Sequence, residues 1–115
     1  MTGVQTCALP IYNLLGVELP LYSSALNTAG RCDLIGEFDG VPSIIDFKTS
    51  RKLKRESYIE NYFLQTTVYS MMFEWMYKIK IPQIVIMIAV DDEMPQLFVK
   101  DRGHFVNRVL EVFRD

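Results

Sequence analysis

Two alternating runs of strand-forming residues, 31–38 and 41–48, are separated only by Asp39 and Gly40. Asp-Gly is a favoured two-residue hairpin loop because both of its positions tolerate a positive φ. The pattern therefore predicts a β-hairpin, and the turn fixes which residues of the two strands lie opposite each other.

The rest of the pattern predicts three more strands and two helices. An apolar stretch before the hairpin is typical of a strand that Pro20 confines to an edge or an end. Between residues 58 and 77, apolar and aromatic residues recur at helical spacing with no Gly or Pro, which predicts a long helix packed on the sheet. The run QIVIMIAV indicates a strand covered on both faces. The expected strands are 14–22, 31–38, 41–48, 83–90 and 96–100, and the expected helices are 58–77 and 101–115.

These elements predict an α/β (α+β) domain with a central mixed sheet of about five strands flanked by helices. A chain of 115 residues, half of them hydrophobic, is long enough for one core and too short for several domains. The second helix stops without a cap signal, so we expect the domain to be truncated at both ends.

Residues 2–11, TGVQTCALPI, resemble the conceptual translation of a sequencing adapter. Such a segment is excluded from fold reasoning. We therefore expect 1–11 to be an artefact and 12–115 to be an incomplete natural domain.

The hairpin register predicts a pair of facing carboxylates. Counting from the turn, Asp33 lies opposite Asp46 in a pair without mutual hydrogen bonds, where side chains approach closely. Lys48, two residues further along, shares their face because strand side chains alternate. The pattern places six other side chains on the opposite face: Cys32, Leu34, Phe38, Val41, Ile45 and Phe47.

Facing carboxylates repel each other, so a positive charge is expected between them. A Mg²⁺-type cation suits the pair, since it takes one or two carboxylates and completes its shell with water and phosphate oxygens. Four basic residues follow the hairpin in the loop: Arg51, Lys52, Lys54 and Arg55. The net charge of −2 excludes a global basic field, so a nucleic acid would have to be held locally.

Cysteine and histidine usage excludes other site chemistries. Cys7 and Cys32 form no disulfide or zinc framework, and the single His104 cannot build a histidine metal site. Pro10 and Pro20 argue against a membrane span near the N-terminus. We expect a reducing cytoplasmic setting in a bacterial or phage-infected cell.

Asp33, twelve further residues and then Asp46-Phe47-Lys48, followed by a helix with Gln65 and Tyr69, form a recognisable set. It resembles the PD-(D/E)XK nuclease superfamily, and within it the RecB-type branch that carries a Gln-x-x-x-Tyr motif. The stretch 29–69 is especially similar to exonucleases of the mitochondrial genome maintenance type and their phage and bacterial relatives. A restriction-endonuclease-like core is implied.

The resemblance implies a role for each matching residue. Asp33, Asp46 and the backbone carbonyl of Phe47 would bind Mg²⁺ or Mn²⁺, and Lys48 would serve the attacking water and the phosphate. The residues expected to contact DNA are Thr49, Ser50, Arg51, Lys52, Lys54, Arg55, Gln65 and Tyr69. Relatives add an acidic ligand from an upstream helix, which the adapter-like segment replaces here. Glu18 lies on a predicted strand and is not assigned that role, so activity of the truncated chain is left open.

The expected function is metal-dependent DNA exonuclease activity on single-stranded or frayed ends. One alternative is a structure-specific endonuclease on the same core, and another is a non-catalytic nucleic-acid-binding module. Each signal also has a purely structural interpretation: a neutralised surface cluster for the acids and Lys48, a solvated basic loop, and a hydrogen-bonded pair on a helix face for Gln65 and Tyr69.

Overall fold

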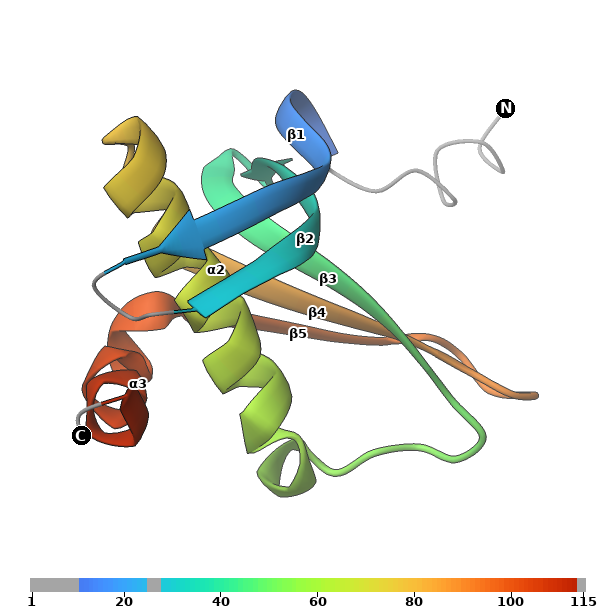
Figure 1. Cartoon of the computed structure of the whole chain (residues 1–115). Helices are drawn as coiled ribbons and strands as arrows, with labels where there is room; N and C mark the ends of the chain where they lie inside the picture. The colour runs from blue at the N-terminus through green and yellow to red at the C-terminus, as the bar shows by residue number, and fades with distance from the viewer. Residues whose placement is uncertain (1–10, 25–27, 114–115) are drawn as a thin grey trace.

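The computed structural model of the protein describes residues 11–24 and 28–113 (Figure 1). Most of the adapter-like segment, with Cys7, and part of the polar connection before the hairpin lie outside the described residues. The elements in chain order are β1 Ile11–Ser23, β2 Thr28–Phe38, β3 Val41–Ser50, a 3-10 helix Glu56–Tyr58, α2 Glu60–Tyr77, β4 Gln83–Val90, β5 Gln96–Asp101, a 3-10 helix Arg102–His104 and α3 Val106–Phe113.

The five strands form one mixed sheet in the order β1-β2-β3-β4-β5. Neighbouring strands are antiparallel except β3 and β4, which are parallel and are connected through α2. A parallel pair needs such a long crossover because the chain must return to the same end of the sheet. The expected α+β fold with a mixed five-stranded sheet is confirmed.

The predicted hairpin is confirmed at its turn. Asp39 and Gly40 both have positive φ, 53° and 82°. The predicted register holds from the pair Phe38–Val41 to the pair Leu34–Ile45. The ladder between β2 and β3 then stops, so the expected Asp33–Asp46 and Arg31–Lys48 pairs are not part of it.

Beyond the end of this ladder the two strands part. β2 continues beside β1 as far as the pair Ser23–Thr28, while β3 continues beside β4 as far as the pair Ser50–Val90. Figure 1 shows the two strands leading away from each other toward opposite ends of the sheet. The parting leaves a gap in the backbone pairing beside the two acidic residues.

Strict alternation of side chains along β2 is also wrong at this place. Cys32 and Ile35 are both buried in the core under the helices, although alternation would put them on opposite faces. The alternation is therefore broken at Asp33 and Leu34. Contrary to the expectation, Cys32 does not share the face of Phe47. The placing of Leu34, Phe38 and Ile45 together on the other face is confirmed.

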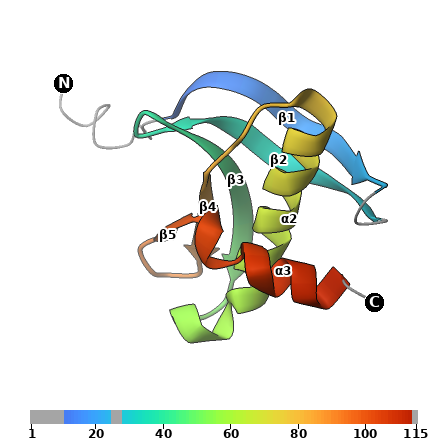
Figure 2. The ribbon, with the colours of Figure 1, turned by 90° about the vertical axis from the view of Figure 1, so that its left-hand side faces the viewer.

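Both helices cover the same face of the sheet, as Figure 2 shows. Phe63 and Met72 of α2 and Val109 of α3 belong to one core. This core is completed by isoleucines of three strands, Ile35, Ile44, Ile84, Ile86 and Ile88. On the opposite face the described residues form a small buried cluster of Phe38, Ile45 and Val85. The expectation that the fourth strand is covered on both faces is thus correct for Val85 but wrong for exposed Ala89.

Helix α2 begins two residues later than expected, since Tyr58 lies in the preceding 3-10 helix and is 72% exposed. The side chains buried under it include small polar ones, Thr66, Thr67 and Ser70, rather than only the expected aromatic residues. Thr66 Oγ1 donates to the Tyr62 carbonyl oxygen of the preceding turn, which satisfies its hydroxyl inside the core. This rotation of the helix leaves Gln65 exposed, within reach of Lys48 on the central strand β3.

The expected C-terminal helix begins later as well, because a 3-10 turn separates β5 from α3. Asp101 starts that turn by accepting a hydrogen bond from the Gly103 N–H. No helix in the described part of the chain combines the length and apolarity that a membrane crossing would need.

Candidate functional site

The candidate site lies where β2 and β3 part. Asp33 comes from β2, and Asp46 and Lys48 come from β3. Asp33 Oδ2 accepts a hydrogen bond of 2.9 Å from the Phe47 N–H. A carboxylate thus takes the place of the backbone acceptor that a continued ladder would have supplied, and it holds Asp33 beside Asp46 although the strands are no longer paired.

Asp46 is a buried acid with an incompletely satisfied carboxylate. The residue is 5% exposed, and its Oδ2 lies 3.1 Å from Lys48 Nζ. Among the residues that the structure describes, Oδ2 has this ion pair but no hydrogen bond of good geometry. Burial raises the pKa of Asp46, nearby Lys48 opposes this, and neighbouring Asp33 adds to it. A buried carboxylate oxygen without a well-formed hydrogen bond keeps lone pairs with which it can bind a cation.

Lys48 is held on three sides. Besides its contact with Asp46, its Nζ donates to Gln65 Oε1 at 3.1 Å and lies 4.8 Å from the centre of the Tyr62 ring. A cation over an aromatic face is attracted by the ring quadrupole. Sequence analysis did not assign Tyr62 to the site, although its position three residues before Gln65 places both on one side of the helix.

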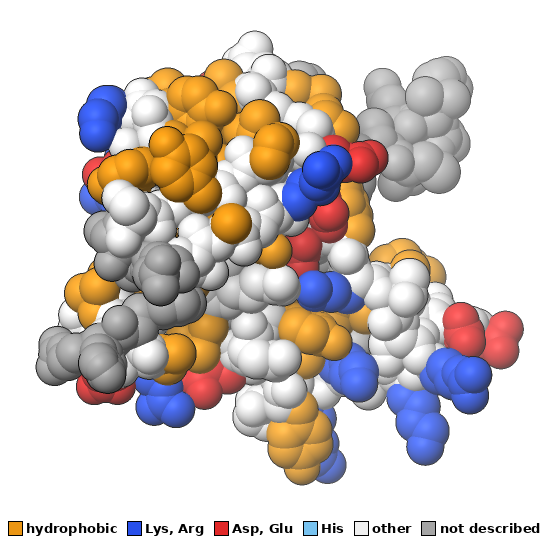
Figure 3. All heavy atoms as spheres, viewed as in Figure 1, with side chains coloured by type: hydrophobic (Ala, Val, Ile, Leu, Met, Phe, Trp, Pro, Cys, Tyr) orange, Lys and Arg blue, Asp and Glu red, His pale blue; other side chains and the backbone are white. Residues whose placement is uncertain are grey.

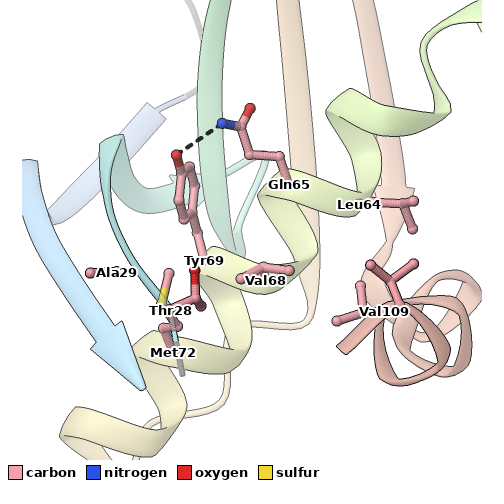
Figure 4. Close-up of a pocket in the computed structure, with 9 residues that line it drawn as sticks. Thr28, Ala29, Leu64, Gln65, Val68, Tyr69, Met72 and Val109 are labelled. Carbon is pink, nitrogen blue, oxygen red and sulfur yellow. Dashed lines mark hydrogen bonds between the residues drawn. The ribbon is translucent and has the colours of Figure 1, made fainter. Parts of the chain in front are cut away.

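Gln65 and Tyr69 extend this arrangement along α2. Gln65 Nε2 donates to the Tyr69 hydroxyl at 3.1 Å (Figure 4). The Tyr69 ring lies against the backbone of Gly30, where an added Cβ would come within 2.9 Å of the ring. Burial, with a contribution from Asp46, raises the pKa of Tyr69, so its hydroxyl stays protonated at neutral pH. Gly30 therefore leaves the space in which Tyr69 can hold Gln65 against Lys48.

The four basic side chains of the loop 51–55 are exposed and form no ion pair among the residues that the structure describes. Figure 3 shows Lys and Arg side chains gathered at the lower right, where Figure 1 draws the chain between β3 and α2. Ser50 begins the loop with a turn in which its Oγ accepts from the Lys52 N–H at 3.2 Å. Arg55 lies over the Tyr58 ring. Thr49, by contrast, lies exposed on the strand next to Lys48.

Gln96 of β5 holds this loop and was not found by sequence analysis. Its Oε1 accepts from the Lys54 N–H at 2.8 Å, and its Nε2 donates to the Lys54 carbonyl oxygen at 2.9 Å. The side-chain amide thus imitates a pairing strand. Nothing in the sequence points to this contact, because 42 residues separate the two partners.

Within 11–24 and 28–113 no three acidic, histidine or cysteine side chains come together as a metal cluster. Glu18 shares with Asp33 and Phe47 a groove of about 460 Å³ on the face away from the helices, but it completes no such cluster. The Asp46 oxygen that lacks a well-formed hydrogen bond, beside Asp33, nevertheless fits a Mg²⁺-type ion, which needs only one or two carboxylates.

No protein-family model matches this chain, and no curated protein matches it. Two solved structures are similar in fold. A candidate exonuclease from Eubacterium rectale has a TM-score of 0.62 at 13% identity, over 85% of this chain and 41% of that one. SSO0001 has a TM-score of 0.52 at 18% identity, over 97% of this chain and 53% of that one. The chain thus spans about half or less of each neighbour, and the similarity shows the fold alone.

Proposed function

We propose that this protein is a nuclease of the PD-(D/E)XK type that hydrolyses DNA phosphodiester bonds with a divalent metal. The observation that carries the proposal is the meeting of Asp33, Asp46 and Lys48 where β2 and β3 part, with a buried carboxylate oxygen that accepts no hydrogen bond. The fold similarity to a candidate exonuclease supports the same class.

The carboxylates of Asp33 and Asp46, with the backbone carbonyl of Phe47, would hold Mg²⁺ or Mn²⁺. When bound, such an ion polarises the phosphate and lowers the pKa of a coordinated water. Burial of Asp46 favours this arrangement, because a desolvated anion gains more from a neighbouring cation than a solvated one does.

Lys48 would supply a fixed positive charge to the phosphate oxygens. Its ammonium is a compact point charge suited to phosphate. Gln65 and Tyr62 hold it in place before substrate arrives, so little reorganisation is needed as negative charge develops in the transition state.

The basic loop and α2 would guide the nucleic-acid strand. Arg51, Lys52, Lys54 and Arg55 have no anionic partner in the described chain, and phosphate contacts by such residues supply most sequence-independent affinity. Thr49 and Ser50 lie between the loop and the acids. On α2, Gln65 contacts Lys48, and Tyr69 is hydrogen-bonded to Gln65. We infer an exonuclease acting on single-stranded or frayed ends.

The test is cleavage of end-labelled linear and circular single-stranded DNA, with and without Mg²⁺. We expect metal-dependent digestion of the linear form only, and a loss of about a hundredfold or more in the Lys48→Ala variant, as for the removal of a transition-state charge contact. Asp92→Asn is the control, because Asp92 is exposed at the β4–β5 turn with φ 58°, a conformation that Asn tolerates.

Two outcomes would replace the proposal. Cleavage of the circular form would indicate an endonuclease on the same core. Salt-sensitive binding without any metal-dependent cleavage, unchanged by Lys48→Ala, would indicate a non-catalytic binding module.

A further inference from the structure

A cavity of about 290 Å³ lies between the start of β2, the middle of α2 and α3. Its floor consists of the buried side chains of Val68, Met72 and Val109. Figure 4 shows Tyr69 and Gln65 of α2 on one side of it and Ala29 of β2 beside them. The cavity thus combines a buried apolar floor with a partly polar rim.

The rim of this cavity is continuous with the candidate site. Gln65 and Tyr69 line the cavity, and the same two side chains are hydrogen-bonded to each other and, through Gln65, to Lys48. Lys48 Nζ is 3.1 Å from Gln65 Oε1, so a phosphate held by Lys48 would lie one side chain away from the cavity.

We propose that the cavity receives one unstacked nucleobase of the strand whose phosphate lies at Lys48. This proposal rests on the proposed function and adds a base subsite to it. The volume is at the lower limit of common small-molecule sites, which suits a single flat ring system rather than a whole larger ligand. Aromatic and apolar walls accept the face of any base, since every base has a π-face.

The rim also indicates how selective the subsite is. Gln65 uses its carbonyl oxygen for Lys48 and its amide nitrogen for the Tyr69 hydroxyl. These two contacts fix the orientation of the amide, and at most one N–H bond and one lone pair of it remain for the hydrogen-bonding edge of a base. With most of the lining apolar, we expect the subsite to distinguish a base from no base and to discriminate little among the four bases.

The experiment measures the binding of short labelled single-stranded oligonucleotides without added divalent cation, so that no turnover occurs. A series of oligonucleotides carries one base-free residue, placed at each position in turn. We expect one position at which removal of the base weakens binding by about tenfold, the loss typical of one base–aromatic stacking contact.

The Ala29→Trp variant fills the cavity from its exposed rim without touching Lys48. We expect it to bind the intact oligonucleotide as weakly as the wild type binds the base-free one, with no further loss when both changes are combined. Val41→Trp adds the same ring at the exposed start of β3 and is expected to change neither value. Should Ala29→Trp not fold, Val112→Trp fills the cavity from α3.

The outcomes distinguish a failure of the base subsite from a failure of the nuclease proposal. Wild-type binding that is equally strong for every base-free position, or equal losses by Ala29→Trp on intact and base-free strands, overturns the base subsite and leaves the nuclease proposal standing. No binding of single-stranded DNA by the wild type overturns the base subsite, while the cleavage test with Mg²⁺ decides the nuclease proposal separately.

Discussion

The two ends of the β2–β3 hairpin are built from the same strands and serve opposite purposes. At the turn end the backbones pair from Phe38–Val41 to Leu34–Ile45, and Ile45 is fully buried. At the open end the ladder stops, the Phe47 N–H is satisfied by the Asp33 carboxylate, and a buried acid faces a lysine. The turn end holds the fold together, whereas the open end contains charged groups that a stable core would exclude.

Among the variants considered, Asp46→Asn is expected to change the cleavage rate most. It should also show most clearly that the open end of the hairpin serves activity at the expense of stability. Removing the anion should lower metal-dependent cleavage by about a thousandfold or more, since one group of a catalytic unit commonly supplies several kcal/mol. The same change should raise the free energy of unfolding at pH 7 by about 1 kcal/mol, a typical size for a single substitution, because a desolvated charge disappears. The measurements are cleavage rate and urea unfolding, with Asp92→Asn as the control.

The pH dependence of this effect has a definite sign. Burial raises the pKa of Asp46, opposed by Lys48 and reinforced by Asp33, so the folded protein holds this proton more tightly than the unfolded chain does. The wild type should therefore lose stability as pH rises from the ordinary value of 3.8 through the raised pKa, and the Asp46→Asn variant should lack this loss. Equal profiles of stability against pH for the wild type and the Asp46→Asn variant would contradict the inference that ionisation of Asp46 destabilises the folded protein.

Ile45→Ala tests the turn end in the opposite sense. Ile45 is fully buried with Phe38 and Val85, so the change should lower the free energy of unfolding by about 2–5 kcal/mol through lost burial and a residual cavity. Cleavage per folded molecule should stay within about twofold, because the hydrophobic side chains packed against this cluster in the described structure, Ile11, Leu34 and Met87, are not those of the site. A large loss of cleavage at unchanged stability would show that the two ends are not separate.

Sequence reasoning was reliable where the backbone alone decides the structure. Asp-Gly determines the turn, and the turn determines the register for as long as the backbones remain paired, which is as far as Leu34 and Ile45. The same reasoning put Asp33 opposite Asp46 and Cys32 on the outer face, and both expectations fail at the parting of the strands. There a side-chain carboxylate replaces a backbone acceptor. The alternation of side chains along a strand presupposes continuous backbone pairing, so it does not predict such a replacement.

The helix was predicted in its length but not in its rotation about its axis. Thr66 and Ser70 are polar in any sequence pattern, yet both are buried because the carbonyl oxygens of Tyr62 and Ile81 accept from their hydroxyls. The second of these acceptors comes from beyond the helix, so only the tertiary structure supplies it. The meeting of Gln65 with Lys48, which the site depends on, is a consequence of this rotation.

Gly30→Ala is expected to have an intermediate effect confined to the open end. An added Cβ would meet the Tyr69 ring at 2.9 Å, so the ring must move and Gln65 loses its support. We expect cleavage to fall by about tenfold through misplaced Lys48, in the range of one lost positioning contact. In the control, Gly16→Ala, the nearest neighbours are the flexible side-chain atoms of Leu19 at 3.1 Å and beyond. Kinetics as slow for Gly16→Ala as for Gly30→Ala would contradict the role of Tyr69.

The smallest effects are expected from truncating two glutamines, one at each end of the β2–β3 hairpin. At the turn end Gln83 Nε2 donates to the Phe38 carbonyl oxygen at 3.2 Å and to Ser43 Oγ at 2.9 Å, while at the open end Gln96 holds the backbone of Lys54. Each truncation to Ala removes two hydrogen bonds, worth about 0.5–1.5 kcal/mol apiece.

Gln96→Ala frees the basic loop, so KM for single-stranded DNA should rise about three- to tenfold with kcat nearly unchanged, as expected when only substrate binding is weakened. Gln83→Ala should instead lower the urea midpoint and leave KM unchanged, because Gln83 lies at the turn end. Steady-state kinetics and unfolding curves of both variants decide the matter. Equal shifts of KM in the two variants would mean that the basic loop does not depend on Gln96. The difference between the two ends of the hairpin would then be confined to the acidic residues.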